Sequence, residues 1–248
     1  MEYRGASAYN DDQFFKNYIT RRNRKESPNN IIEKPILFEM IGEVQGEKVL
    51  DLGCGDAKFG VELLQNGCIS YDGVEGSVNM AKEAFKTLDG TEGRVHLSSI
   101  ETWDFQSENY NLVVSRLALH YLSELENIFK ETHKSLAHNG RFIFSVQHPV
   151  LTSSIKSAAA SSSKTDWVVD DYFNGGERVE PWIDNKVVKY HRTIEEYFQL
   201  LKQAGFMIED IREGTPRAER FSSESEYKRR KRIPLFLMFS CRKLKSLE

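Results

Sequence analysis

Residues 49–56 read Val49-Leu-Asp-Leu-Gly-Cys-Gly-Asp56, and this stretch decides the fold of the chain. A short apolar run leads directly into glycines at positions 53 and 55, and a segment of helical character, 58–65, follows. A strand, a glycine turn and a helix in this order form a binding loop at the carboxyl edge of an open α/β sheet. Glycine lets the backbone approach a ligand with no Cβ in the way. The sequence therefore predicts an α/β domain with a ligand site at this turn.

Working outward, short apolar runs alternate with helical segments. We expect strands at 48–52, 69–75, 94–97, 111–115 and 141–146, and helices at 58–65, 77–87 and 123–137. Ser77 and Ser123 are the expected N-caps, and Asn139-Gly140 is expected to close the last helix. This alternation predicts a parallel sheet covered by helices on both faces, a three-layer sandwich of the Rossmann-like α/β class.

The last part of the chain returns to the same pattern. A helix is expected at 193–204, followed by strands at 206–212 and 235–241. No apolar segment of helix length separates those two strands, so we expect a hairpin in which one strand runs antiparallel to its neighbour.

Two segments lie outside this pattern. Residues 10–42 predict two helices broken near Ser27-Pro28, so we assign residues 1–45 to an N-terminal helical cover and 46–248 to the main domain. After Pro149 the pattern stops for about forty residues, which is long for a loop inside a compact domain. The aromatic residues in its second half are too apolar for a flexible linker, so we expect a lid inserted at 150–192.

Composition limits the classes of function. A chain of 248 residues with 40% hydrophobic content can bury one sizeable core, and a net charge of −3 gives no general attraction to nucleic acids or membranes. The three cysteines form no CxxC pair, so we expect no metal site and a reducing cytoplasm. No apolar run is long enough to span a bilayer, and the polar N-terminus shows no secretory signal. We expect a cytoplasmic protein with no membrane partner.

The residues around the turn select the ligand. A dinucleotide fingerprint needs a third glycine at position 58, where this chain has Lys58. Asp51 and Asp56 would repel phosphates and attract a cationic ligand such as S-adenosylmethionine. Glu75 stands at the end of the second strand, where a carboxylate can accept hydrogen bonds from both ribose hydroxyls. These features disfavour a nicotinamide-dependent reductase.

Five segments resemble, in order and spacing, the successive motifs of class I S-adenosylmethionine-dependent methyltransferases. They are Asp51-Leu-Gly-Cys-Gly55, Gly73-Val-Glu-Gly-Ser77 with Met80, Ser99-Ile-Glu-Thr-Trp-Asp104, Asn111-Leu-Val-Val-Ser-Arg-Leu-Ala-Leu-His120 and Leu136-Ala-His-Asn-Gly-Arg-Phe142. The resemblance implies a seven-stranded, mostly parallel sheet with an antiparallel last strand. It also implies that the glycine turn holds the methionine part of the cofactor, the second-strand acid the ribose, and the loop after the third strand the adenine.

The flanks resemble a bacterial, small-molecule subgroup of the methyltransferase type 11 kind. The matching segments are Phe144-Ser-Val-Gln-His-Pro149, Asp171-Tyr172, Gly176-Glu-Arg178, Lys189-Tyr-His-Arg-Thr193 and Ala204-Gly-Phe206. The chain departs from the pattern at two positions. Glu75 replaces the more usual Asp, which keeps the chemistry. Ser99 stands where many relatives have Asp, so the adenine amino group would rely on the backbone or on Glu101.

The resemblance implies that the chain binds S-adenosyl-L-methionine and releases S-adenosyl-L-homocysteine. The expected cofactor residues are Asp51, Gly53, Cys54, Gly55, Asp56, Glu75, Gly76, Ser77, Met80, Ser99, Ile100, Glu101, Ser115, Arg116, Leu117 and His120. Histidine titrates in the range useful to a general base, so the candidate catalytic residues are His120, His148 and His191. The cover and lid supply the candidate acceptor residues Tyr9, Tyr18, Arg22, His148, Tyr172, Arg178, Trp182, Tyr190 and Arg192.

The predicted function is methyl transfer to an oxygen, nitrogen or sulfur atom of a small acceptor with a ring or a carboxylate. Alignment of the reactants, rather than a metal, would supply most of the rate. An RNA or tRNA methyltransferase is an alternative because of the basic runs 21–25 and 228–232, but such runs are usually solvated, so nucleic acid is a disfavoured partner. A catalytically silent S-adenosylmethionine-binding module is a further alternative. The sequence leaves open whether the protein is a monomer or a homodimer.

Overall fold

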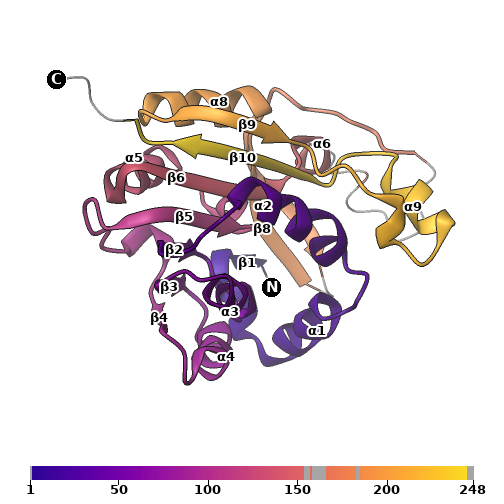
Figure 1. Ribbon diagram of the computed structural model, residues 1–248. Coiled ribbons are helices and arrows are strands. Elements are labelled where there is room, and N and C mark those ends of the chain that lie inside the picture. Colours follow the sequence, from indigo (N-terminus) through magenta and orange to yellow (C-terminus); the bar gives the residue numbers. More distant parts are fainter. Residues whose placement is uncertain (1, 154–156, 158–165, 183–184, 245–248) are drawn as a thin grey trace.

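The computed structural model describes residues 2–153, 157, 166–182 and 185–244. Its main sheet has seven strands in the order β4-β3-β2-β5-β6-β10-β9 (Figure 1). Among these strands, only β10 runs in the direction opposite to the other six, as the sequence predicted. Their bounds are β2 Lys48–Leu52, β3 Ser70–Glu75, β4 Gly93–Leu97, β5 Tyr110–Arg116, β6 Leu136–Gln147, β9 Met207–Arg212 and β10 Phe236–Arg242.

Helices cover both faces of this sheet, because its central strands are apolar on both sides. Along β5, Val113 packs into one core, whereas Leu112 and Val114 pack into the other. The first core is closed by α5 (Glu126–Ser135) and α8 (Ile194–Gln203). The second core is closed by α2 (Lys34–Ile41), α3 (Lys58–Gln65) and α4 (Val78–Leu88). The predicted three-layer α/β sandwich is confirmed.

Some local predictions are wrong. Ser77 does cap α4, since its side chain accepts a hydrogen bond from the Met80 N–H. Ser123 caps nothing, because α5 begins only at Glu126 with Leu125 at its N-cap. That helix ends at Ser135, and Asn139 lies inside β6 with a φ of 62°. The reason is that β6 starts early, with Leu136 opposite Tyr110, and the register shifts before Arg141.

The strands β9 and β10 pair antiparallel, as predicted, but they are not joined by a simple hairpin. Their connection contains a 3₁₀ turn, η5 (Ala218–Arg220), and a short helix, α9 (Glu224–Arg230), that buries no residue. A helix without an apolar face leaves no periodic signal, which is why the sequence did not predict it.

The N-terminal segment and the 150–192 insertion form a second sheet. Two helices occur where they were expected, α1 (Asp12–Arg22) and α2, joined through the π-helical turn η2 (Asn29–Glu33). Ahead of them lie β1 (Glu2–Arg4) and the 3₁₀ segment η1 (Gly5–Asn10). The insertion begins with α6 (Pro149–Thr152) and contains β7 (Gly176–Trp182) and β8 (Asn185–His191). The strand β1 pairs with β8, which pairs with β7, so two segments distant in sequence lie side by side (Figure 1).

Candidate active site

The glycine turn lies between β2 and α3. Gly53 has a φ of 82° and Gly55 a φ of 60°, a left-handed conformation that favours glycine. The backbone N–H of Gly53 donates to the Val74 carbonyl at 2.8 Å, which ties the turn to β3. A Cβ at position 53 would lie only 2.5 Å from the Cβ of Ala118. The loop after β5 therefore approaches the turn so closely that a side chain at position 53 has no room.

Glu75 ends β3 and is 6% exposed. Its Oε2 accepts the N–H of Gly55 at 2.9 Å, and its Oε1 accepts the N–H of Ser77 at 2.7 Å. Burial raises the pKa of Glu75, and these two N–H donors oppose that rise. A carboxylate oxygen can accept more than one hydrogen bond, so both oxygens keep capacity for a ligand's hydroxyl groups.

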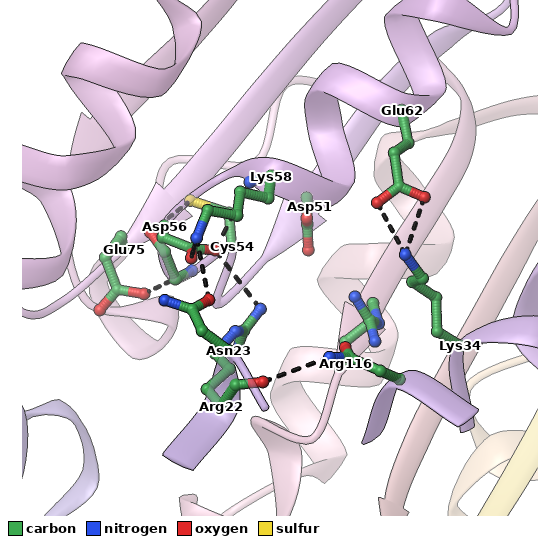
Figure 2. A network of polar contacts seen from close by, with 12 residues as sticks. Arg22, Asn23, Lys34, Asp51, Cys54, Asp56, Lys58, Glu62, Glu75 and Arg116 are labelled. Carbon is green, nitrogen blue, oxygen red and sulfur yellow. Dashed lines mark hydrogen bonds and ion pairs between the residues drawn. The ribbon is translucent and has the colours of Figure 1, made fainter. Parts of the chain in front are cut away.

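Two buried acids flank the turn. The Oδ2 of Asp51 accepts from the Tyr71 hydroxyl at 2.7 Å, whereas its Oδ1 is buried with no hydrogen-bond partner among the described residues. Burial raises the pKa of Asp51 to about 6. Asp56 forms ion pairs with Arg22 at 3.5 Å and with Lys58 at 3.2 Å, and these side chains converge on it in Figure 2. The unsatisfied oxygen of Asp51 fits a ligand with a cationic donor.

The segment beyond β5 is held in a strained conformation. Leu117 has a φ of 54°, and its N–H donates to the Ser145 carbonyl at 2.9 Å. The guanidinium of Arg116 bonds the buried carboxylate of Glu33, which also accepts from the Ser145 hydroxyl at 2.7 Å. Such strain persists only where the surroundings fix it, and it is common at ligand sites.

A cavity of about 500 Å³ lies at this carboxyl edge. Many of the residues predicted from the sequence line it. From the cofactor set these are Gly53, Gly55, Glu75, Gly76, Met80, Ser99, Ile100, Glu101, Arg116 and Leu117, and from the acceptor set Tyr9, Tyr18, Arg22 and Tyr190. The cavity is lined in addition by residues that sequence reasoning missed: Arg4, Gly5, Ala6, Ser7, Asn10, Asn29, Ala118, Tyr121, Leu122 and Ser123.

Other residues of the predicted cofactor set lie behind the cavity surface. Asp51, Cys54, Asp56, Ser77, Ser115 and His120 are buried and do not line it. Several of them shape the loops that do: the Ser115 hydroxyl donates to the Leu52 carbonyl at 2.7 Å, and Ser77 caps α4. For Ser77 and Ser115, the place in the motif is therefore explained by the loops they hold.

None of the three candidate histidines lines the cavity. The Nδ1 of His148 accepts from the Val150 N–H at 3.1 Å, and its Nε2 donates to Glu213 at 3.0 Å. The Nε2 of His191 donates to the Tyr172 carbonyl at 2.8 Å, and its Nδ1 accepts from the Thr152 hydroxyl at 2.6 Å. Both rings are thus engaged at both nitrogens.

His120 is buried next to the cavity wall. Burial lowers its pKa well below the usual value, and the nearby positive charges of Lys189 and Arg192 add to that effect. Its imidazole is therefore neutral, and its Nδ1 has no hydrogen-bond partner among the described residues.

The remaining acceptor candidates hold the insertion in place rather than facing the cavity. The Tyr172 hydroxyl accepts from the Ile194 N–H at 3.4 Å. Arg178 donates to the carbonyls of Asn174 and Glu177. Arg192 donates to two backbone carbonyls of the loop after β5. Of Trp182, only the strand backbone is among the described parts of the chain, so the prediction for its side chain lies outside them.

The missed lining residues come largely from the first ten positions. The Asn10 side-chain oxygen accepts from the Val78 N–H at 2.9 Å and from the Ser77 hydroxyl at 3.0 Å, so the segment is fixed at the start of α4. Ala6 lies 3.0 Å from the point where a Cβ on Gly76 would be. Arg4 bonds Glu177 of β7 at 2.6 Å and Tyr190 of β8 at 3.1 Å. A three-residue strand is too short to show alternation, so no sequence signal marked it.

Comparison with known proteins identifies the family. A crystal structure of a candidate S-adenosylmethionine-dependent methyltransferase from Listeria monocytogenes matches with a TM-score of 0.80 and 32% identity, covering 86% of this chain and 97% of that one. The chain belongs to the class I S-adenosylmethionine-dependent methyltransferases. Its residues 49–140 match the family model described as a methyltransferase domain. The cofactor of this methyltransferase is S-adenosylmethionine.

Two further relatives match most of the chain. A methyltransferase structure from Mesorhizobium loti has a TM-score of 0.79 and 27% identity, with 88% of this methyltransferase and 98% of that chain covered. An uncharacterized protein of Haemophilus influenzae is 27% identical over 248 residues, which is 96% of this chain and 97% of that protein. Within the described residues, the methyltransferase has no group of side chains suited to a metal ion and no helix long and apolar enough to cross a membrane.

Proposed function

We propose that this methyltransferase moves the methyl group of S-adenosylmethionine to an oxygen, nitrogen or sulfur atom of a small molecule that carries a ring or a carboxylate. The observation that carries the proposal is the cavity of about 500 Å³, within the size range of small-ligand pockets. Its lining combines residues of the glycine turn and Glu75 with tyrosines of the cover and of the loop after β5. Donor and acceptor would therefore share one enclosed site.

The cofactor fits the residues present. Glu75 would accept the ribose hydroxyls, and the segment Ser99–Glu101 would border the adenine. The methionine part would lie over Gly53 and Gly55, with Asp51 nearby to favour its amino group. The guanidinium of Arg22 lies 3.7 Å from the point where a Cβ on Gly55 would be, so we assign Arg22 to the cofactor's carboxylate. When bound, the cofactor supplies an electrophilic methyl group on a sulfonium.

The chain's own contribution is to align and enclose the reactants. We propose that residues 1–45 and the 150–192 insertion act as the cover over the main domain 46–248. Support comes from the pairing of β1 with β8 and from the contact of Ala6 with Gly76. We also keep a reducing cytoplasm as the proposed compartment of this methyltransferase.

The acceptor part of the cavity favours a neutral or anionic molecule. Tyr9, Tyr18, Tyr121 and Tyr190 line the cavity, and we assign them to the acceptor; the two acids in the lining, Glu75 and Glu101, we assign to the cofactor. Burial raises the pKa of both Tyr9 and Tyr121, so their hydroxyl groups stay neutral and can donate hydrogen bonds. Tyrosine rings also suit a flat acceptor.

Nucleic acid remains the weaker candidate. In α9, Lys228 pairs with Glu224 at 2.7 Å and Arg229 pairs with Glu226 at 2.6 Å, so part of the basic run is neutralised within its own helix. In the other basic run, Arg22 is directed to the cavity and to Asp56.

The test uses S-adenosylmethionine with a labelled methyl group and a cell extract divided into a small-molecule fraction and an RNA fraction. We expect label in the small-molecule fraction with the wild-type protein and none with Gly53→Arg, which places a side chain in the turn. Label in RNA alone would establish the nucleic-acid alternative. Tight binding of S-adenosylhomocysteine without label in either fraction would favour a silent binding module.

A further inference from the structure

The cavity wall after β5, residues 117–123, is held at its far end by a side chain from the insertion. Arg192 follows directly after β8 and is 5% exposed. Its Nη2 donates to the Leu122 carbonyl at 2.9 Å and to the Ser123 carbonyl at 2.7 Å. Both of those residues line the cavity, whereas Arg192 does not. Arg192 therefore acts on the cavity through this wall and not by lining the cavity itself.

The near end of the wall is fixed separately. Leu117 adopts a left-handed φ of 54°, and its N–H is bonded to the Ser145 carbonyl at 2.9 Å. Between the two ends lies the 3₁₀ turn η4 (Leu119–Tyr121), in which the Tyr121 N–H donates to the Ala118 carbonyl at 3.0 Å. A single 3₁₀ turn has poor hydrogen-bond geometry and little stability of its own. The position of Tyr121 thus depends on how both ends are held, in addition to its packing against the cluster of Ala8, Phe14 and Val187.

We propose that Arg192 is a positioning residue for the acceptor: it fixes the wall 117–123 from behind, and through that wall the orientation of Tyr121 in the cavity. The inference rests on the proposed function, because it assigns this part of the cavity to the acceptor. Hydrogen bonds from a charged donor are stronger than neutral ones, and Arg192 makes two of them to successive carbonyls. The position of Arg192 at the end of β8 is in this way linked to the geometry of the acceptor site.

The insertion contains a matched control. Arg178 is also buried, at 7% exposure, and it also donates to backbone carbonyls. Its partners, Asn174 and Glu177, belong to the insertion itself. Arg192→Met and Arg178→Met thus remove the same charge from similar surroundings, but only the first removes a contact with the cavity wall.

The test compares Arg192→Met, Arg192→Lys and Arg178→Met with the wild type by amide hydrogen exchange. In Arg192→Met we expect the amides of Tyr121 and Leu122 to exchange about tenfold faster, with no change in β2 or α4. Arg192→Lys keeps a cationic donor and should restore part of the protection. Arg178→Met should leave the wall unchanged. Wild-type exchange of 117–123 in Arg192→Met, or an equal effect of Arg178→Met, would overturn the proposal.

Activity gives a second readout. With the small-molecule fraction as acceptor, Arg192→Met should transfer methyl groups about tenfold more slowly, while its affinity for S-adenosylhomocysteine stays within about threefold of the wild type. Equal losses of cofactor affinity and rate would overturn a role confined to the acceptor side. A wild-type protein that labels no small molecule would contradict the proposed function, whereas the hydrogen-exchange result tests the role of Arg192 independently.

Discussion

Replacing Glu75 by Gln exchanges one carboxylate oxygen for an NH₂ group, and the resulting loss of cofactor affinity can be worked out from the contacts of that carboxylate. Both carboxylate oxygens already accept backbone N–H groups, from Gly55 at 2.9 Å and from Ser77 at 2.7 Å. An amide has only one oxygen, so its NH₂ group must face one of those two donors whichever way the side chain is oriented. The same NH₂ group offers no acceptor to a ribose hydroxyl.

The expected loss follows from the strength of one such bond. A hydrogen bond to a charged group contributes about 1.5–3 kcal/mol. At 1.4 kcal/mol for each factor of ten, the dissociation constant for S-adenosylhomocysteine should rise about 10- to 100-fold. The effect on the free energy of unfolding should be smaller, because burial of the ionised Glu75 is itself unfavourable and Gln removes that penalty.

Isothermal titration calorimetry with S-adenosylhomocysteine measures this directly. Glu92→Gln is the control, since Glu92 is exposed and does not line the cavity. We expect the control to bind within about threefold of the wild type, because surface charges contribute little. An unchanged dissociation constant for Glu75→Gln would refute the assignment of this carboxylate to the cofactor.

Three further predictions concern single side chains around the site. Gly53→Ala places a Cβ 2.5 Å from that of Ala118 at a φ of 82°, and should lower the free energy of unfolding in urea by about 2–4 kcal/mol, against about 1 kcal/mol for Gly55→Ala. Burial raises the pKa of Asp51 to about 6, so the free energy of unfolding of the wild type should fall by about 3 kcal/mol as the pH rises from about 4 to 6. The free energy of unfolding of Asp51→Asn should not fall in this range, and parallel pH profiles of the two free energies would contradict the prediction. His148→Ala removes the cap of α6 and should lower the free energy of unfolding by about 1–2 kcal/mol, and His148→Asn should lower it less. Both variants should bind S-adenosylhomocysteine as the wild type does. A selective loss of turnover in a fully stable His148→Ala protein would instead support catalysis by this ring.

The sheet and the cofactor side of the cavity could be predicted because their signals are local. Strand β2, the glycines at 53 and 55, and Glu75 lie on contiguous motifs, and the turn geometry allows little else at those positions. The N-cap at Ser77 followed from the same local chemistry. Ser123 is also a serine that precedes a helix, yet it lines the cavity and does not cap α5. The carbonyl of Ser123 accepts from Arg192, and α5 begins only at Glu126 with Leu125 at its N-cap, so the hydroxyl of Ser123 is not at the helix start.

The acceptor side could be predicted only in part because its geometry depends on pairing between distant segments. Tyr9, Tyr18 and Tyr190 were expected from their aromatic character, but Arg4 and Asn10 carry no periodic or motif signal. Nothing in the residue type separates a histidine whose nitrogens are both bonded from one that faces a ligand. The side chains of His148 and His191 are engaged by partners far along the chain, Glu213 and Thr152.

The strand order has a consequence for how the protein is made. The strand β10 is the last of the described strands in the chain, yet it hydrogen-bonds between β6 and β9 in the middle of one half of the sheet. During synthesis, a nascent chain that ends before Phe236 therefore presents the facing edges of β6 and β9 without their common partner. Exposed strand edges pair readily with other chains. The interval before β10 leaves the ribosome is thus the period in which we expect this protein to depend most on chaperones, and C-terminal truncations should aggregate rather than lose only cofactor binding.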